Sequence, residues 1–123
     1  MRILLAAPDR DLLTCYREIL AVPFGEVVTA FDGTQVLSLL QTESFDLVLL
    51  DSDIPRVSRK GLFRRIREKK IPVIEMTAGR NLPGDPAPDA VLTYPFTPEE
   101  ICAAVSSQLQ MTAQDAGEEA SDE

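Results

Sequence analysis

The sequence contains no histidine, and this absence narrows the chemistry open to its 123 residues. Histidine is the side chain most often used for proton transfer near neutral pH, so catalysis by an imidazole base is excluded. A Gly-rich or Ser/Thr-rich phosphate loop is also missing after the first apolar segment, residues 3–6. An enzyme, including a flavin-dependent one, therefore has little support.

Cysteine is scarce, and no apolar run is long. The two cysteines, Cys15 and Cys102, occur without a signal peptide, which indicates a reducing compartment rather than a disulfide framework. We expect both to be small buried side chains. No apolar stretch approaches the length that crosses a membrane, and no basic segment precedes an apolar one at the N-terminus. The expected location is cytoplasmic, without a membrane partner.

Hydrophobic residues make up 45% of the sequence, which is enough for one domain with a substantial core. The net charge of −8 is concentrated at the end of the chain, because residues 111–123 contain five acids and no base. This segment also has little apolar surface to bury. We therefore expect a folded domain over residues 1–110 and a disordered acidic tail over residues 111–123.

Strand and helix patterns alternate along the folded part of the chain. Apolar residues spaced three and four apart predict helices between the strands. Asp9 is placed to cap the first helix, and Thr97 with Glu100 forms a capping box at the start of the last. This alternation implies a parallel α/β sheet with right-handed crossovers. The expected strands lie at residues 3–6, 26–31, 46–51, 71–77 and 90–93.

Asp51 ends the most informative of these strands. Residues 46–55 are an apolar run that stops abruptly in carboxylates and a proline. Such a run is typical of a strand buried on both faces of a parallel sheet. Ligands bind at the carboxyl ends of strands in doubly wound sheets. Asp51 is therefore a candidate reactive or metal-binding group, and a carboxylate that only caps the following turn is the alternative.

Two further segments match Asp51 in position. Thr77 follows the fourth expected strand, and Tyr94-Pro95-Phe96 follows the fifth. With the start of the chain, this ordered set resembles the receiver domain of bacterial response regulators over residues 1–110. The resemblance implies a flavodoxin-like, doubly wound sheet of strand order 2-1-3-4-5. It also implies that Asp51 accepts phosphate from a histidine kinase, that Thr77 contacts the phosphoryl group, and that Pro95 follows a cis bond.

The charged residues of that family pattern are missing here. The positions of its acidic pair are Ala7 and Pro8, Tyr94 replaces its lysine, and Val91 replaces an aromatic residue. Aspartyl phosphate forms when a carboxylate attacks phosphorus, and both partners are negative, so nearby positive charge is needed. Two unit charges about 4 Å apart interact by roughly 4 kcal/mol at an effective dielectric constant near 20. The sequence therefore predicts a degraded site.

The remaining acids leave a weak Mg²⁺ site open as a hypothesis. Asp9 and Asp53 could supply carboxylates beside Asp51, since Mg²⁺ prefers oxygen ligands. The position of Asp9 ahead of a helical stripe favours a helix cap over a metal ligand. For Asp53, the sequence leaves two interpretations open: a metal ligand, or an acid in a solvated loop.

The segment between the fourth and fifth strands departs from the family pattern as well. Residues 79–93 contain three prolines and two glycines, so we expect the fourth helix of a receiver to be short or absent. Glu75 is a charge in the middle of a central strand, where an unpaired carboxylate is costly. Because a short or absent fourth helix covers this face of the sheet less completely, we expect Glu75 to be partly hydrated or paired with a base such as Arg80.

Basic residues form a cluster after Asp51. A solvated helix face is the favoured interpretation; an acidic partner or the acidic tail is the alternative, and nucleic acid is not expected. The cluster holds eight of the twelve Lys and Arg residues, namely Arg56, Arg59, Lys60, Arg64, Arg65, Arg67, Lys69 and Lys70.

Two functions in two-component signalling are consistent with this pattern. The favoured one is a pseudo-receiver, a non-enzymatic binding module whose partner contacts do not depend on phosphate. The other is a receiver that still accepts phosphate on Asp51. The expected partner is a histidine kinase or another signalling protein, and a homodimer is left open.

Overall fold

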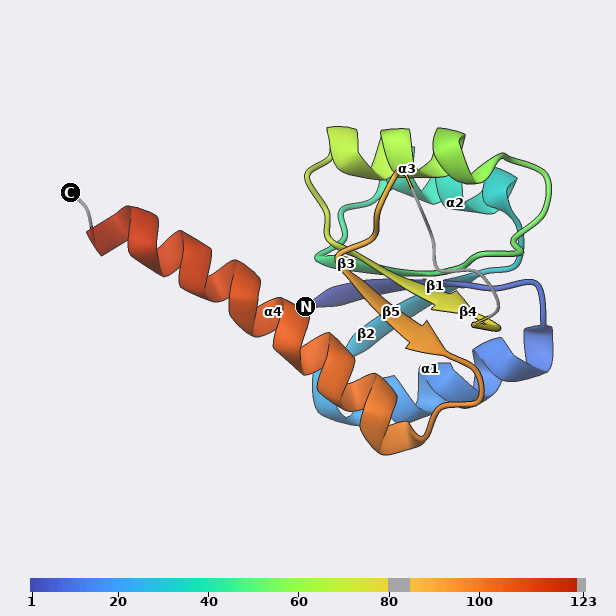
Figure 1. Ribbon diagram of the computed structural model, residues 1–123, viewed down its shortest axis with the longest axis horizontal. Helices are drawn as coiled ribbons and strands as arrows, with labels where there is room; N and C mark the ends of the chain where they lie inside the picture. Colours follow the sequence, from blue (N-terminus) through green and yellow to red (C-terminus); the bar gives the residue numbers. More distant parts are fainter. Residues whose placement is uncertain (80–84, 122–123) are drawn as a thin grey trace.

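The computed structural model describes the backbone of residues 1–79 and 85–121 and the side chains of residues 1–79 and 85–111. Its centre is a parallel sheet of five strands in the order β2-β1-β3-β4-β5 (Figure 1). This order confirms the doubly wound, flavodoxin-like α/β fold expected from the sequence. The strands are β1 (Arg2–Ala6), β2 (Glu26–Ala30), β3 (Leu47–Asp51), β4 (Val73–Thr77) and β5 (Ala90–Thr93).

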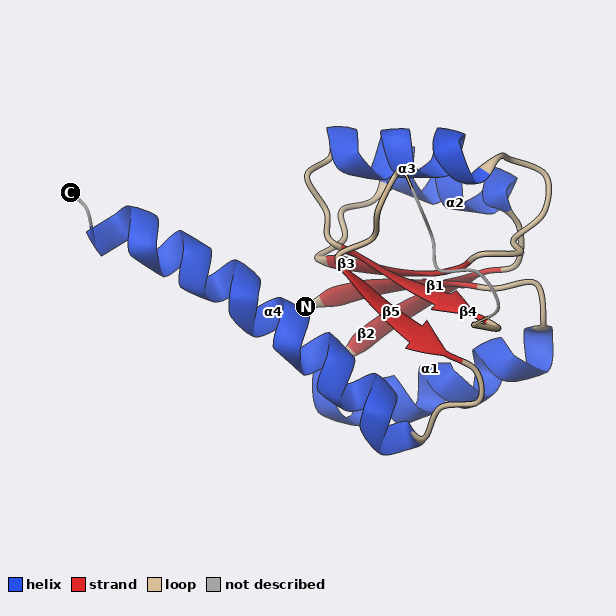
Figure 2. Ribbon diagram, in the orientation of Figure 1, coloured by secondary structure: helices blue, strands red, loops and turns tan. Residues whose placement is uncertain are grey.

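Helices cover both faces of the sheet (Figure 2). Strand side chains alternate between two apolar cores: Leu4 and Val48 pack on the side of α2 and α3, whereas Leu5 and Leu49 pack on the side of α1 and α4. No helix in the described part of the chain is long and apolar enough to cross a membrane. The helices are α1 (Arg10–Phe24), α2 (Gly33–Thr42), α3 (Arg59–Glu68) and α4 (Pro98–Ser121).

The helix starts follow the capping residues in the sequence. The Asp9 side chain accepts hydrogen bonds from the first backbone N–H groups of α1, as predicted. At α4, the Glu100 N–H donates to the Thr97 hydroxyl at 3.1 Å, and the Thr97 N–H donates to the Glu100 carboxylate at 3.0 Å. This reciprocal pair confirms the predicted capping box.

The connection between β4 and β5 contains no helix in its described residues, 78–79 and 85–89. This agrees with the expectation that the fourth helix of a receiver is short or absent. The described part is tied to α3 instead. Arg67 donates to the Asp89 carboxylate at 2.7 Å and to the Ala87 carbonyl at 2.9 Å. Asp89 also accepts the backbone N–H of Val73 at 2.8 Å, which joins the loop to the start of β4.

Glu75 is fully buried and is paired with an arginine, although not with the one suggested by the sequence. Two guanidinium N–H groups of Arg59 donate to its two carboxylate oxygens, each at 2.8 Å. Arg59 also donates to the Pro86 carbonyl and lies over the Phe63 ring. Arg80 lies outside the described residues. A base from α3 therefore neutralises Glu75 and holds the described part of the connection between β4 and β5.

α4 runs further than expected. Its backbone is helical to Ser121, through most of the segment 111–123 in which the sequence predicts disorder. Figure 1 shows this end of the helix projecting beyond the sheet. Alanine, glutamine and glutamate recur in the segment, and their helix propensity favours a helical backbone. A folded unit that ends at residue 110 stays a prediction.

The predicted burial of the cysteines is wrong. Cys15 is exposed on α1, and Cys102 is half-buried on α4. Both are free thiols. Burial and the nearby Glu99 carboxylate raise the pKa of Cys102, which disfavours its reactive thiolate form.

Candidate functional site

Asp51 is held by hydrogen bonds to both of its carboxylate oxygens. It ends β3 at the carboxyl edge of the sheet, and only 7% of its surface is exposed. Oδ1 accepts the backbone N–H of Asp53 at 2.7 Å, and Oδ2 accepts the hydroxyl of Tyr94 at 2.7 Å. Hydrogen bonds to an ionised acceptor are among the stronger ones in proteins. The carboxylate is therefore fixed in one orientation by two neutral donors.

Tyr94 reaches Asp51 because its backbone and its ring are both fixed. The Tyr94 N–H donates to the Thr77 carbonyl at 2.8 Å, directly after β5. The Tyr94–Pro95 peptide bond is cis, as the family resemblance implies. The ring stacks on Phe96 at a centroid distance of 5.0 Å, and Phe96 stacks on Tyr16 at the same distance. This aromatic stack aims the Tyr94 hydroxyl at the carboxylate.

The environment keeps Tyr94 protonated. Burial raises the pKa of its phenol, and the hydrogen bond to the Asp51 carboxylate raises that pKa further, because the phenolate could not donate this bond. Tyr94 thus donates a hydrogen bond but brings no positive charge to the position of the family's lysine.

We expect the tyrosines of the folded protein to resist ionisation at the pH where free tyrosine titrates. Burial raises the pKa of Tyr16 as well, and the sequence has two tyrosines in all. Since both folded-state values lie above the unfolded value near 10, the associated stability is present below about pH 10 and is lost as the pH rises further. Tyrosinate absorbance at about pH 10.5 should be low in the native protein and high in urea. Full native ionisation at that pH would contradict the buried hydrogen bond of Tyr94.

Thr77 lies at the same edge of the sheet as Asp51. It ends β4, and Asp51 is paired in register with Met76, the residue before Thr77. The Thr77 side chain is nearly buried, and its hydroxyl accepts the backbone N–H of Gly79 at 3.4 Å. The fold thus brings Asp51, Thr77 and Tyr94 to one edge, where the sequence predicts them. The role of Thr77 toward a phosphoryl group stays a prediction.

The three acids considered for Mg²⁺ do not form a metal-binding group. Asp9 is engaged as the α1 cap, where its Oδ1 accepts the N–H groups of Asp11 at 3.0 Å and Leu12 at 3.2 Å. Asp53 is exposed and contributes its backbone N–H to Asp51. Among the described residues, no three His, Cys, Asp or Glu side chains lie close enough to hold a metal ion.

These donors do not fit Mg²⁺. The ion needs several oxygen ligands in near-octahedral geometry. Ala7 and Pro8, at the family's acidic positions, supply no side-chain oxygen, and both oxygens of Asp51 already accept hydrogen bonds. The described residues thus offer Mg²⁺ one partly engaged carboxylate.

The sequence places Tyr94 at the position of the family's lysine, but sequence reasoning missed Arg59 as the partner of Glu75. The available signal was the position of Arg59 at the first turn of the third helix. That helix covers the sheet face on which Glu75 lies.

Comparison with known sequences identifies the family. Residues 3–106 match the response regulator receiver domain. The transcriptional regulatory protein CpxR of Escherichia coli K12 is 33% identical over 115 residues, which cover 89% of this chain and 49% of CpxR. The probable transcriptional regulator ycf27 of Cyanophora paradoxa is 36% identical over 93 residues, covering 71% of this chain and 39% of that protein. The chain thus spans half or less of the length of these relatives.

Solved structures agree with this match. A CheY-like response regulator receiver domain protein from Methanospirillum hungatei superimposes with a TM-score of 0.85 at 21% identity, covering 93% of this chain and 97% of the other. The response regulator TrrA from Thermotoga maritima, solved in complex with Mg²⁺–BeF, gives a TM-score of 0.78 at 27% identity over 88% of this chain and 98% of its own. The chain belongs to the response regulator receiver domain family.

Proposed function

We propose that this chain is a pseudo-receiver, a signalling module that binds its partners without phosphorylation of Asp51. The observation that carries the proposal is the double hydrogen bond to the Asp51 carboxylate, from the Asp53 N–H and the Tyr94 hydroxyl. A nucleophilic carboxylate needs an oxygen aimed at phosphorus. Each Asp51 oxygen keeps a further lone pair, but the oxygen that faces Tyr94 is held by a hydroxyl whose ring is fixed by the stack with Phe96.

The charge around Asp51 supports the same conclusion. No Lys or Arg side chain in the described residues forms an ion pair with Asp51. A transferred phosphoryl group would add negative charge beside an acid, and electrostatic stabilisation of that charge is usually the largest contribution to catalysis. Tyr94 contributes one neutral donor, which stabilises an anion less than an ammonium group does.

As a pseudo-receiver, the chain acts in the cytoplasm through protein contacts in two-component signalling. Its partner is a histidine kinase or another signalling protein, or a second copy of the chain. It performs no catalysis of its own and does not act on nucleic acid or membranes.

The alternative is a receiver that accepts phosphate on Asp51. The observation in its favour is the convergence of Asp51 and Thr77 at one sheet edge, since these residues occupy the phosphoacceptor and hydroxyl positions of the family. Phosphorylation would then have to displace the Tyr94 hydroxyl first.

We expect little or no phosphate adduct on Asp51 when the protein is incubated with acetyl phosphate and Mg²⁺. Both carboxylate oxygens are engaged, and the site lacks the charge that stabilises the transferred group. Intact-protein mass spectrometry at acidic pH measures the adduct directly, with Asp51→Asn as the matched control. A substantial adduct on the wild type that is lost in Asp51→Asn would replace the pseudo-receiver proposal with the alternative.

A further inference from the structure

Positive charge on this chain is concentrated on α3 and its flanks. Residues 56–70 hold eight of the twelve Lys and Arg residues and one of the twenty acids, Glu68. Three of these cations pair with acids elsewhere in the fold: Arg59 with Glu75, Arg67 with Asp89 and Arg56 with Asp32. The other cations of this segment are not needed for those contacts.

Like charges four positions apart recur among the remaining cations. Lys60 and Arg64 have this spacing on α3 and repel each other. Arg65 and the C-cap residue Lys69 have it too, although positive charge is favourable at the C-terminal end of a helix. All four are exposed. Within the described residues, their ion pairing is limited to Arg65 with Glu68 at 3.9 Å, an exposed pair that contributes little. A face selected only for solubility would mix acids with these bases, so the pattern points to an acidic ligand.

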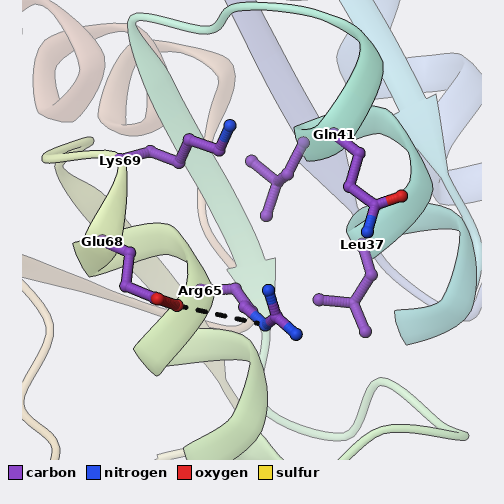
Figure 3. Close-up of a pocket in the computed structure, with 6 residues that line it drawn as sticks. Leu37, Gln41, Arg65, Glu68 and Lys69 are labelled. Atoms are coloured by element: carbon purple, nitrogen blue, oxygen red, sulfur yellow. Dashed lines mark ion pairs between the residues drawn. The ribbon is translucent and has the colours of Figure 1, made fainter.

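A pocket opens between α2 and α3 beside these cations (Figure 3). Leu40 is buried and Leu37 is half-buried, so α2 supplies an aliphatic surface. Figure 3 shows Arg65 and Lys69 extending from α3 toward the α2 side chains. The pocket thus combines an aliphatic wall with a cationic one. Its lining residues are Leu37, Leu40, Gln41, Arg65, Glu68 and Lys69.

We propose that this α2–α3 pocket is a docking site for an acidic segment of a partner protein. The segment inserts one aliphatic side chain against Leu37 and Leu40 and places its carboxylates against Arg65 and Lys69. Charge complementarity selects the acidic partner, and the aliphatic wall selects the anchor. This surface is separate from Asp51, so the proposal holds whether or not Asp51 accepts phosphate.

The same features disfavour two other ligands. The acidic segment 111–123 of the chain itself contains no leucine, isoleucine, valine or phenylalanine to fill the pocket. Binding of single-stranded nucleic acid without sequence preference uses aromatic side chains on which the bases stack, and no aromatic residue lines this pocket.

The test uses two labelled peptides made of glutamates, one with a central leucine and one with serine at that position. By fluorescence anisotropy, the leucine peptide should bind the full chain about tenfold more tightly than the serine peptide, because only leucine buries apolar area. Lys69→Glu should weaken the affinity for the leucine peptide by about tenfold. Arg17→Glu makes the same charge change at an exposed residue of α1, and it should alter that affinity by less than about twofold. Leu37→Ser should remove the preference for leucine.

Backbone amide NMR shifts locate the peptide and check that each variant is folded. Shifts confined to α2 and α3, and unchanged affinity in Asp51→Asn, support the proposal. Equal affinity for both peptides, or equal losses in Lys69→Glu and Arg17→Glu, would show a general charge attraction and overturn it. Tighter binding of a DNA oligonucleotide than of the leucine peptide would also overturn it, in favour of a nucleic acid surface.

Discussion

Replacing Arg59 with leucine is expected to destabilise the protein by about 3–5 kcal/mol, because it leaves a buried carboxylate without its countercharge. Glu75 has no exposed surface, and two N–H groups of Arg59 donate to its two carboxylate oxygens. The substitution also removes the donor to the Pro86 carbonyl and the cation over the Phe63 ring. Urea unfolding followed by circular dichroism measures the change as a lower midpoint.

A second variant separates the buried charge from the loss of packing. In Arg59→Leu with Glu75→Leu, neither charge of this ion pair remains, and replacement of a buried ion pair by apolar residues is often neutral. Most of the lost stability should therefore return. Arg64→Leu removes an exposed arginine from the same helix and should change stability by less than about 0.5 kcal/mol. Equal losses from Arg59→Leu and Arg64→Leu would mean that Glu75 does not depend on its partner.

The fold was predictable because local patterns and global topology agree in this chain. The apolar run before Asp51 became a strand buried along its whole length, and the caps at Asp9 and Thr97 mark the starts of α1 and α4. Helix-breaking residues correctly predicted that the described residues between β4 and β5, 78–79 and 85–89, form no helix. These features depend on near neighbours in the sequence, and alternation then restricts the topology.

Side-chain partners were less predictable, because they depend on which distant residues the fold brings together. Glu75 required a base as its partner, but the sequence offered several. Arg59 lies 16 residues away, on the helix that covers this face of the sheet. The hydrogen bond from Tyr94 to Asp51 spans 43 residues and depends on the stack with Phe96. The spacing in the sequence correctly placed Tyr94 at the carboxyl edge of the sheet. Only the tertiary structure shows that its hydroxyl donates to the Asp51 carboxylate.

The helical backbone of residues 111–121 shows a different limit. Composition argued against burial, and burial is what stabilises most helices in proteins. The segment nevertheless continues α4, whose buried residues Ile101 and Val105 anchor the helix earlier in the chain. Extending an existing helix avoids the cost of nucleating a new one, so propensity alone can set its backbone.

Phosphorylation should be restored in part by Pro8→Asp combined with Tyr94→Lys. The first substitution adds a carboxylate at an exposed position that belongs to the family's acidic pair. The second removes the hydroxyl that occupies Asp51 Oδ2 and supplies a cation in its place. The new carboxylate attracts Mg²⁺, and the new lysine attracts the phosphoryl group. At an effective dielectric constant near 20, each of these close charge pairs is worth roughly 4 kcal/mol. The adduct yield with acetyl phosphate and Mg²⁺ should therefore rise by orders of magnitude.

Matched variants assign the gain to its cause. Pro8→Asn with Tyr94→Lys keeps the size at both positions but lacks the new carboxylate, so its adduct should be smaller. Tyr94→Phe alone releases Oδ2 without adding charge, and it should gain little if charge is the limiting factor. Asp51→Asn in the double variant should abolish any adduct.

Failure of the double variant would direct attention to the loop after β3. That loop is anchored to the start of α2: the Pro55 carbonyl accepts the Gly33 N–H at 2.9 Å, and Arg56 pairs with Asp32 at 3.4 Å. A Cβ on Gly33 would lie 2.7 Å from the Val57 side chain, so the loop packs tightly on the start of α2. If restored charge gives no adduct, this fixed loop rather than the missing charge prevents phosphate from reaching Asp51.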